Sequence, residues 1–446
     1  MKMDELAVLM KECGIVGAGG AGFPSYAKLN EKADTIILNC AECEPLFKLH
    51  RQLLAQNAAE ILWALDTVRN AVGAKDVILA IKKVYSETIE AVEENIGEYK
   101  NMTVALLPEI YPAGDELITI YETTGRVVEP GKLPISKGVI VFNVETILNT
   151  YYALKEKTPV CYKYLTVAGA VKNPITVRVP LGITFKDAVK LAGGETTEEC
   201  EYLNGGAMTG RLAKKNDLVT KTTNAVLVLP KDHPVVMKKK ANTKTNIYRA
   251  MSSCCQCRMC TDLCSRNLLG HPIEPHSVMR AISKGMTSDI AAVVNTAYCS
   301  QCRLCDMYSC QQGLAPGALI GVLKNEIRAK GIKLPDEPKF KGPDEQRKFK
   351  LVPMERLVSR LGLKEYDVEA PVAEISLKNK EFKIALSQHI GQPAKPLVKK
   401  GDKVETFQKI ASCEGLGAEI HSPVSAKVKD VTEKYIILSS AEKGEI

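Results

Sequence analysis

Two cysteine runs with nearly the same spacing constrain this chain more than any other feature. The chain holds 15 cysteines, and eight of them fall into two runs between positions 254 and 310. Three thiolates spaced two residues apart wrap one face of a four-iron cubane, and in two-cluster ferredoxins the fourth cysteine of a run serves the other cluster. We therefore expect two [4Fe–4S] clusters that carry single electrons. The predicted ligands are Cys254, Cys257, Cys260 and Cys264 in the first run and Cys299, Cys302, Cys305 and Cys310 in the second.

The runs depart from the commonest ferredoxin pattern without losing a ligand. Ser265 and Gln311 follow the fourth cysteines, where bacterial ferredoxins usually have proline. The second run has four residues before Cys310 instead of three, and Cys255 adds a thiol that leaves open a second register for the first run. The alternative is a pair of four-thiolate zinc sites, but zinc ribbons favour CxxC pairs separated by about fifteen or more residues.

Composition predicts a globular protein of several domains. A chain of 446 residues is too long for one compact core, and 45% hydrophobic and 25% charged residues are ordinary values. No apolar run reaches the roughly 18 residues of a membrane span, and the N-terminus lacks the features of a signal peptide. Cysteines without an export signal favour metal or redox use over disulfides. We therefore expect a cytosolic, cytoplasmic protein.

Charge gives no sign of nucleic-acid binding. The formal net charge is +8, and the basic cluster Lys238, Lys239 and Lys240 is small. A nucleic-acid surface needs a larger basic face with interleaved aromatic residues, whereas aromatic residues make up only 5% of this chain. The cluster is interpreted as a solvated linker.

The first third of the chain has an α/β pattern. Apolar runs at 34–39, 76–81 and 139–144 predict buried strands, and residues 52–71 repeat apolar side chains near a 3.6-residue period, which predicts a helix. Alternating strands and helices favour a partly parallel sheet covered by helices. We expect an α/β domain over residues 1–158.

Four further units are expected, which makes the fold multidomain, α/β and α+β. Short strands around a helix that ends at Gly193 predict a β-grasp-like module. A segment rich in Lys, Pro and Glu is typical of a linker, and a final series of short strands predicts a small sandwich. The predicted bounds are 159–235 for the module, 245–330 for a ferredoxin-like two-cluster domain, 331–372 for the linker and 373–446 for the sandwich.

A glycine loop near the N-terminus could bind phosphate. Gly17, Gly19 and Gly22 match the spacing of the dinucleotide fingerprint. The preceding segment has a helical pattern, so an ordinary Rossmann site is not expected. Glycines still allow close backbone approach to a phosphate, the N-terminus of a following helix would add a favourable field, and Lys28 could supply a charge. The alternative is a flexible glycine turn.

Polar residues follow the first predicted strand, at the edge where α/β folds bind ligands. They occupy positions 39–45 (NCAECEP). Cys40 and Cys43 form a CxxC pair, which could be a redox pair or half of a zinc site. Because the sequence shows no partner pair nearby, we interpret them as incidental thiols.

Together, four ordered motifs resemble a known family. The glycine loop, residues 39–45, 111–116 (YPAGDE) and 143–146 (NVET) occur in the order found in the flavin-binding 51 kDa subunit of respiratory complex I and in the RnfC electron-transport subunit. The resemblance continues through a soluble-ligand-binding β-grasp (SLBB) module and the two-cluster region, and it covers nearly the whole chain.

The resemblance implies one cavity for FMN and NADH. Ala18 and Ala41 replace a basic and an acidic residue of the complex I version and are similar to the RnfC side of the family. The residues implied for FMN are Gly17, Gly19, Gly20, Gly22, Lys28, Asn39, Glu42, Tyr111, Gly114, Asp115, Asn143 and Thr146. Those implied for NADH are Phe23, Glu44 and Glu116.

The C-terminal unit is similar to a barrel-sandwich hybrid, the shape of lipoyl and biotinyl carriers. A carrier needs a lysine at its hairpin tip, and the corresponding residues 414–418 contain none, so no lipoylation is expected. His389 and His421 lie in turns and are interpreted as structural. The sandwich comes first in RnfC and last here, an order that resembles the PduS-type cobalamin reductases of propanediol-utilisation microcompartments.

The resemblance implies an NADH-dependent flavo-iron–sulfur oxidoreductase. Electrons would pass from NADH through FMN and two [4Fe–4S] clusters to cobalamin or to a corrinoid enzyme. The implied setting is a bacterial microcompartment, with a shell protein, an adenosyltransferase or further copies of the chain as partners. Two alternatives stay open: an RnfC-like relay that delivers electrons to a protein acceptor without cobalamin, and an adaptor whose modules dock partners.

Overall fold

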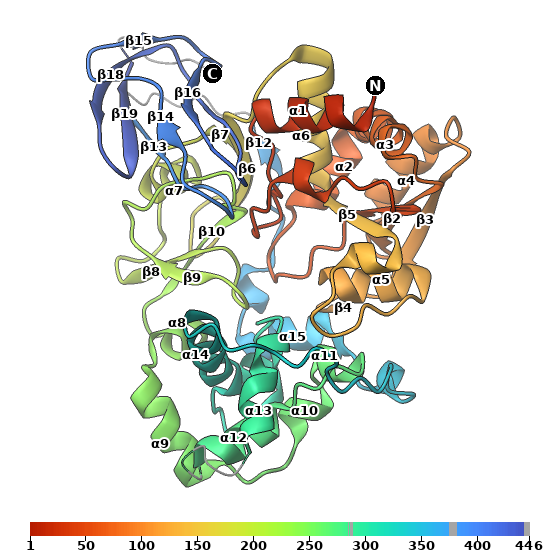
Figure 1. Cartoon of the computed structure of the whole chain (residues 1–446). Helices are drawn as coiled ribbons and strands as arrows, with labels where there is room; N and C mark the ends of the chain where they lie inside the picture. Colours follow the sequence, from red (N-terminus) through yellow and green to blue (C-terminus); the bar gives the residue numbers. More distant parts are fainter. Residues whose placement is uncertain (284, 286–288, 374–380, 441–446) are drawn as a thin grey trace.

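Four bodies of secondary structure surround the centre of the molecule. The structure is a computed structural model that describes residues 1–283, 285, 289–373 and 381–440. In Figure 1 the N-terminal domain and the C-terminal sandwich lie at the top, the β-grasp module lies beneath the sandwich, and the helices around the cysteine runs lie at the bottom. The cysteine runs are thus at the opposite end of the molecule from the sandwich.

A parallel four-stranded sheet with the order β3-β2-β1-β5 is the centre of the N-terminal domain. Side chains alternate along a strand, so Ile36 of β1 packs in the core that includes α3 and α6, whereas Ile37 packs in the core that includes α5. The elements are α1 (Met3–Glu12), η1 (Ser25–Lys28), β1 (Thr35–Asn39), α2 (Leu49–Gln56), α3 (Ala58–Val72), β2 (Asp76–Lys82), α4 (Ser86–Ile96), β3 (Met102–Leu107), β4 (Ile110–Tyr111), α5 (Glu116–Thr124), η2 (Pro134–Lys137), β5 (Val139–Asn143) and α6 (Val144–Glu156).

The helix predicted over 52–71 is two helices. Asn57 ends α2 and precedes α3 with a φ of −132°, outside the helical region, and its side chain donates to the Leu53 carbonyl at 2.9 Å. Asparagine side chains compete with the backbone for such bonds and favour helix ends. The apolar period continues through the break, which is why the pattern alone did not reveal it.

The β-grasp module is a six-stranded mixed sheet with the order β12-β7-β6-β10-β8-β9. Its predicted strands and its helix are present, with Thr184 accepting from the Asp187 N–H as the N-cap of α7. The elements are β6 (Tyr162–Gly169), β7 (Ile175–Pro180), α7 (Phe185–Leu191), β8 (Cys200–Asn204), β9 (Arg211–Ala213), β10 (Ala225–Pro230) and, from much later in the chain, β12 (Val372–Ala373).

Short helices hold the cysteine runs, and two facing sheets form the sandwich. The sandwich sheets have the orders β13-β19-β18-β15 and β14-β16-β17. The helical elements are α8 (Pro234–Lys240), α9 (Thr243–Ser253), α10 (Met259–Asp262), α11 (Ser265–Leu268), α12 (Pro275–Ser283), α13 (Ile290–Val294), η3 (Asn295–Tyr298), η4 (Cys305–Ser309) and α14 (Pro316–Ala329). The strands are β13 (Glu381–Ala385), β14 (Lys395–Pro396), β15 (Lys403–Val404), β16 (Lys409–Ser412), β17 (Ile420–His421), β18 (Ala426–Val431) and β19 (Tyr435–Ser439).

The segment 331–372, predicted to be a linker, packs against two domains over its second half. It contains η5 (Arg347–Phe349), β11 (Val352–Pro353), α15 (Met354–Leu361) and η6 (Lys364–Tyr366). Strand β11 pairs with β4 of the N-terminal domain, and Leu357 and Leu361 of α15 are buried beside Leu304 of the cluster region. The prediction of a linker is wrong here, because a few well-placed apolar residues suffice to bury one helix face.

Buried polar contacts join the domains. Lys163 of β6 forms an ion pair with Glu145 of α6, and both side chains are 1% exposed. The ammonium of Lys221 in the β-grasp module donates to the Gly14 carbonyl at 2.7 Å and to the Glu419 carbonyl of the sandwich at 2.8 Å. These contacts fix the glycine loop relative to both neighbouring modules.

Candidate functional site

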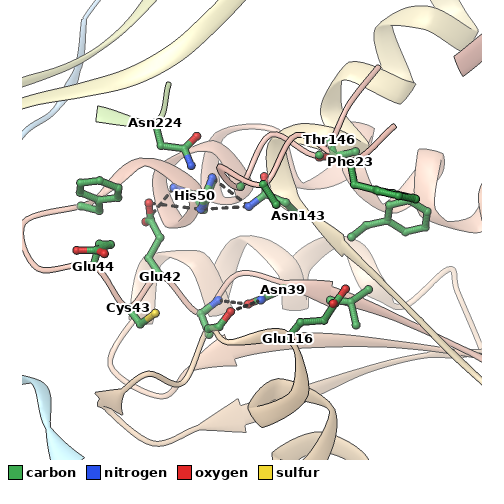
Figure 2. Close-up of a pocket in the computed structure, with 18 of the residues that line it drawn as sticks. Phe23, Asn39, Glu42, Cys43, Glu44, His50, Glu116, Asn143, Thr146 and Asn224 are labelled. Carbon is green, nitrogen blue, oxygen red and sulfur yellow. Dashed lines mark hydrogen bonds and ion pairs between the residues drawn. The ribbon is translucent and has the colours of Figure 1, made fainter. Parts of the chain in front are cut away.

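A cavity of about 320 Å³ lies at the carboxyl ends of β1 and β5. This is the edge of an α/β sheet where ligands bind, and the volume falls in the range of cofactor sites, about 300–1,000 Å³. Figure 2 shows side chains from the end of β1, from α2 and from the start of α6 directed toward it. The residues implied for FMN that line it are Gly17, Gly19, Lys28, Asn39, Glu42, Gly114, Asn143 and Thr146.

The other implied cofactor residues are divided between the cavity and its surroundings. Phe23, Glu44 and Glu116, implied for NADH, line the same cavity. Gly20, Gly22, Tyr111 and Asp115 are outside its lining among the described residues. The structure therefore brings residues of the other three motifs together with Gly17, Gly19, Ala21 and Phe23 of the glycine loop.

The glycine loop is a closed turn held at both ends. Gly17 donates its N–H to the Phe23 carbonyl at 2.8 Å, and Ala18 donates to the Thr146 hydroxyl at 3.0 Å. Gly22 has a φ of +68°, and a Cβ there would meet the Thr222 side chain at 2.7 Å, so this position requires glycine. The element after the loop is the four-residue 3₁₀ turn η1, which corrects the expectation of a helix N-terminus there.

Three side chains form a buried polar network on one wall of the cavity. The Glu42 carboxyl accepts from the backbone N–H of His50 at 2.9 Å, and the Asn143 amide lies 3.1 Å from His50 Nε2. Burial raises the pKa of Glu42 to about 7. Burial, followed by the charge of Lys163, lowers the pKa of His50 to about 3. The histidine is therefore neutral, and the carboxyl titrates near neutral pH.

The cavity has unsatisfied polar atoms, as expected of a site built for a polar ligand. Among the described residues, Ser25 Oγ and Asn224 Oδ1 are buried with no hydrogen-bond partner, Glu42 Oε1 has only a His50 ring nitrogen at 3.4 Å, and all three residues line the cavity. Buried polar atoms are rarely left unpaired in a folded protein. A cofactor with ring nitrogens, ribityl hydroxyls and a phosphate would satisfy these atoms, so the residues present fit FMN.

Three of the charged lining residues already have partners. Lys28 Nζ lies 3.1 Å from Glu116 Oε1 and 3.0 Å from the Val141 carbonyl. Glu44 accepts from the backbone N–H groups of Met208 and Thr209 at 2.9 and 2.7 Å. Glu44 thus ties the cavity wall to the β-grasp module, and Lys28 and Glu116 offset each other's charge.

Sequence reasoning missed several lining residues, among them the polar residues Ser25, His50 and Asn224. His50 lies on α2 just after the polar motif, and Asn224 precedes β10 of the β-grasp module. A lone histidine in a helix and a lone asparagine in a turn give no signal in one sequence. Asn224 reaches the cavity only because the two domains pack together.

The eight predicted cluster cysteines gather into two sets, each with the fourth cysteine of the other run. Cys254, Cys257 and Cys260 surround one hollow with Cys310, and Cys299, Cys302 and Cys305 surround another with Cys264. In the described part of the chain no three Cys, His, Asp or Glu side chains converge closely enough for a single metal ion. Four thiols spread around a hollow fit a four-iron cubane, which takes one thiolate at each of its four irons.

The two cluster loops have the same backbone conformation. Gln256 and Arg258 have φ values of 56° and 67°, and Gln301 and Arg303 have values of 60° and 63°. Left-handed non-glycine residues are uncommon, so their matched recurrence marks the two loops as copies of one motif. In this alignment Cys255 occupies the position of Ser300, which favours the register in which Cys254 is the ligand.

Hydrogen bonds to sulfur follow from this conformation. The Gln301 backbone and side-chain N–H groups both donate to Cys299 Sγ at 3.3 Å, and the Gln256 side chain donates to Cys254 Sγ at 3.2 Å. Hydrogen bonds to the sulfurs are one of the ways in which a protein sets cluster potentials. Both loops are thus built to stabilise thiolate ligands.

The set around Cys302 contacts the cavity domain. The Tyr111 hydroxyl donates to the Cys302 carbonyl at 2.5 Å, and Arg266 forms an ion pair with Asp115 at 2.8 Å. Burial, followed by the charge of Glu44, raises the pKa of Tyr111 well above its usual value, which keeps its proton in place. Tyr111 and Asp115, two of the four implied FMN residues outside the cavity lining, therefore connect the cavity domain to this cysteine set.

The CxxC pair, His389 and the hairpin tip of the sandwich all lie in surroundings that suit structural residues. Burial raises the pKa of Cys40 well above its usual value and that of Cys43 to about 12, and a protonated thiol is a poor nucleophile or ligand. His389 accepts from the Ala418 N–H at 3.2 Å. The hairpin tip contacts the N-terminal domain, where the Tyr26 hydroxyl donates to the Gly415 carbonyl at 3.3 Å.

Among the described residues, the structure has no helix that is both long enough and apolar enough to span a membrane.

Comparisons with known proteins place these features in a family. Residues 10–152 match the Nuo51 FMN-binding domain, 164–212 the SLBB domain, 253–315 the 4Fe-4S dicluster domain and 358–444 the RnfC barrel sandwich hybrid domain. These matches confirm the fold class and the expected FMN and [4Fe–4S] chemistry.

Relatives match over very different shares of the chain. The RnfC-type component of the Na(+)-translocating ferredoxin:NAD(+) oxidoreductase complex of Acetobacterium woodii is 31% identical and covers 60% of this chain and 59% of its own length. Cobalamin reductases PduS of Salmonella typhimurium and Citrobacter freundii are each 38% identical and cover 98% and 96% of this chain, with 96% and 94% of their own lengths aligned. The chain therefore belongs to the PduS cobalamin reductase family.

Proposed function

We propose that this chain is an NADH-dependent oxidoreductase that reduces cobalamin. The observation that carries the proposal is the contact between Tyr111 and Cys302, because it joins the domain that holds a cavity suited to FMN to a loop of predicted cluster ligands within one chain. Near full-length identity of 38% to two proteins named cobalamin reductase supports cobalamin as the acceptor.

The electron balance sets the stoichiometry. NADH gives two electrons, whereas each cobalt(III) centre takes one to become cobalt(II). One NADH, oxidised to NAD⁺ with release of one proton, therefore reduces two cob(III)alamins to cob(II)alamin. Bound FMN and [4Fe–4S] clusters would supply the conversion from hydride to single-electron chemistry.

The cavity residues bind and orient the reactants. Ser25 and Asn224 offer unpaired polar atoms, and the turn of Gly17 and Gly19 presents backbone to a ligand without side-chain obstruction. Lys28, held by Glu116, would place an ammonium donor beside the ligand. Phe23 at the lining supplies an apolar surface beside these groups, where a flat nicotinamide ring could stack.

The contacts of the two cysteine sets indicate the order in which electrons would pass through them. The set of Cys264, Cys299, Cys302 and Cys305 contacts the cavity domain through Tyr111 and Asp115, and the set of Cys254, Cys257, Cys260 and Cys310 includes the exposed Cys257. We infer that electrons enter the first set, here called the inner set, and leave through the second, here called the outer set.

The relay alternative differs in its acceptor. Identity of 31% to a component of an ion-translocating complex over 60% of the chain supports a reading in which the outer set reduces a protein and cobalamin is not a substrate. The order of the two sets would be the same in both readings.

An anaerobic assay separates these functions. Purified protein with full FMN and iron content is mixed with NADH and hydroxocobalamin, and the cob(III)alamin absorbance is followed. The cobalamin reductase bleaches that band with two cobalamins reduced for each NADH. A relay bleaches its own flavin and cluster absorbance and leaves cobalamin oxidised, and an adaptor leaves the flavin oxidised too.

We also propose a microcompartment setting, with a shell protein, a corrinoid enzyme or an adenosyltransferase as partners, by analogy with the PduS relatives. Co-purification of the full chain with intact microcompartments tests this setting. Recovery only outside them would refute it without affecting the chemistry.

A further inference from the structure

A second large hollow, with no role in the function described so far, adjoins the outer cysteine set. It has a volume of about 630 Å³ and shares Gln311 with the hollow of the outer set. Met259, which precedes the ligand Cys260, and Tyr308 line the same wall. The FMN cavity has none of these residues in its lining, so the two sites are separate.

The opposite wall is the segment that contains α15. Residues from Phe349 to Pro353 and the outer face of α15 line the hollow. This wall is firmly attached, because β11 pairs with β4, Leu357 and Leu361 are buried, and Arg347 forms an ion pair with Glu122. The hollow is therefore a fixed feature between the outer set and a packed helix.

The hollow has a positive charge and an exposed aromatic rim. Arg356 and Arg360, one turn apart on α15, line it, and in the described part of the chain neither forms an ion pair with a carboxylate. Lys350 is paired with Asp344, and among the described residues Glu355 is the one acidic residue in the lining. Phe349 is 78% exposed at the edge, which is unusual for a side chain of this size unless it contacts a partner.

We propose that this hollow binds the corrinoid acceptor, with Arg356 and Arg360 contacting the phosphodiester of its nucleotide loop and Phe349 contacting an apolar edge of the macrocycle. The inference rests on the proposed function and adds where its acceptor binds. Guanidinium groups pair well with phosphate, and a cobalt seated here would lie beside the outer set. Each electron then passes from the outer set to cobalt(III), giving cobalt(II), with no bond made to the protein.

The test compares two charge-reversed variants of the full-length holoprotein. Arg356→Glu/Arg360→Glu alters the hollow, and Lys399→Glu/Lys400→Glu makes the same change of net charge at exposed sandwich lysines. The first variant is expected to raise the KM for hydroxocobalamin about tenfold, and the second to leave it unchanged. Both should keep wild-type iron content and a wild-type rate of flavin and cluster bleaching by NADH without acceptor.

A second probe tests the phosphate contact itself. A cobinamide lacks the phosphate-bearing nucleotide loop, so the wild type should bind it more weakly than hydroxocobalamin, and Arg356→Glu/Arg360→Glu should bind the two with similar KM. If that variant keeps the wild-type KM and the wild-type preference for hydroxocobalamin, the acceptor binds elsewhere and only this inference fails. If the wild type bleaches its own clusters with NADH but reduces neither corrinoid, the proposed function fails with it.

Discussion

Glu42 shows how burial can give one side chain a function in a cavity. It is enclosed with His50 and Asn143, and one of its oxygens contacts only the His50 ring, at 3.4 Å. Removal from water disfavours a carboxylate, which is the main cause of its raised pKa of about 7. The neutral His50 does not offset an ionised Glu42, so the charge of this wall depends on pH near neutrality.

FMN affinity should therefore depend on pH through Glu42. Below pH 7 the carboxyl is mostly neutral, and above it a buried negative charge would face an anionic cofactor, so the Kd of the apoprotein for FMN should rise with pH through about 7. In Glu42→Gln the rise should be absent. Fluorescence titration of FMN at several pH values measures both, and equal pH dependence in the two proteins would contradict this role.

The same pKa has a consequence for stability. Between the ordinary value of 4.5 and about 7, the folded apoprotein keeps a proton that the unfolded chain has released. The contribution of Glu42 to the free energy of unfolding therefore falls as pH rises through that window.

At the scale of the element, the two cluster loops repeat one motif and exchange their last ligands. Each loop supplies three thiols from a turn with two left-handed residues, and the fourth thiol comes from the far end of the other run. The short elements that follow the loops, α10 and η4, are in contact with each other, which carries each last cysteine across to the other hollow.

Serine substitutions should reveal this exchange. Cys310→Ser and Cys257→Ser are expected to lose the same EPR signal of the reduced protein, because both belong to the outer set, and Cys264→Ser should match Cys302→Ser. Iron content should fall by about half in each variant, while FMN content stays at the wild-type level. If Cys310→Ser instead loses the same EPR signal as Cys302→Ser, each run holds its own cluster.

Elements with strong local signals were predictable from the sequence. The apolar runs that became β1, β2 and β5 are mostly buried, and the cysteine spacing singled out the eight side chains that gather around the two hollows. The break at Asn57, the packing of α15 and the positions of His50 and Asn224 depend on contacts between segments far apart in the chain. No local period or spacing reports such contacts.

At the scale of the whole molecule, Lys221 links three units. Its buried ammonium bonds to carbonyls of the N-terminal domain and the sandwich, and burial lowers its pKa to about 8. Gly14, one of the acceptors, has a φ of +69° and begins the turn toward the glycine loop. The sandwich thus supports the FMN cavity indirectly, through the geometry of this junction.

Lys221→Met should weaken this junction. Two buried carbonyls would lose their partner, at a cost of about 1–3 kcal/mol each. The exposed Lys172→Met in the same module is the matched control and should change little. Urea unfolding of the apoproteins measures the difference.

The difference in the free energy of unfolding between the wild type and Lys221→Met should increase with pH. From pH 8 toward the ordinary lysine value of 10.5, the unfolded chain holds a proton that folded Lys221 has released, so wild-type stability should rise with pH relative to Lys221→Met. If the difference in the free energy of unfolding between the two proteins stays constant across that pH window, the pKa of Lys221 is not lowered by burial.

We infer that electrons pass from the flavin to the inner set and then to the outer set. Anaerobic stopped-flow mixing with NADH measures this order most directly. In Cys257→Ser, the remaining inner cluster should be reduced at the wild-type rate, while cobalamin reduction is lost. In Cys302→Ser, the flavin should be reduced normally, and the remaining outer cluster should stay oxidised on the same timescale. Reduction of that outer cluster at the wild-type rate in Cys302→Ser would contradict the account.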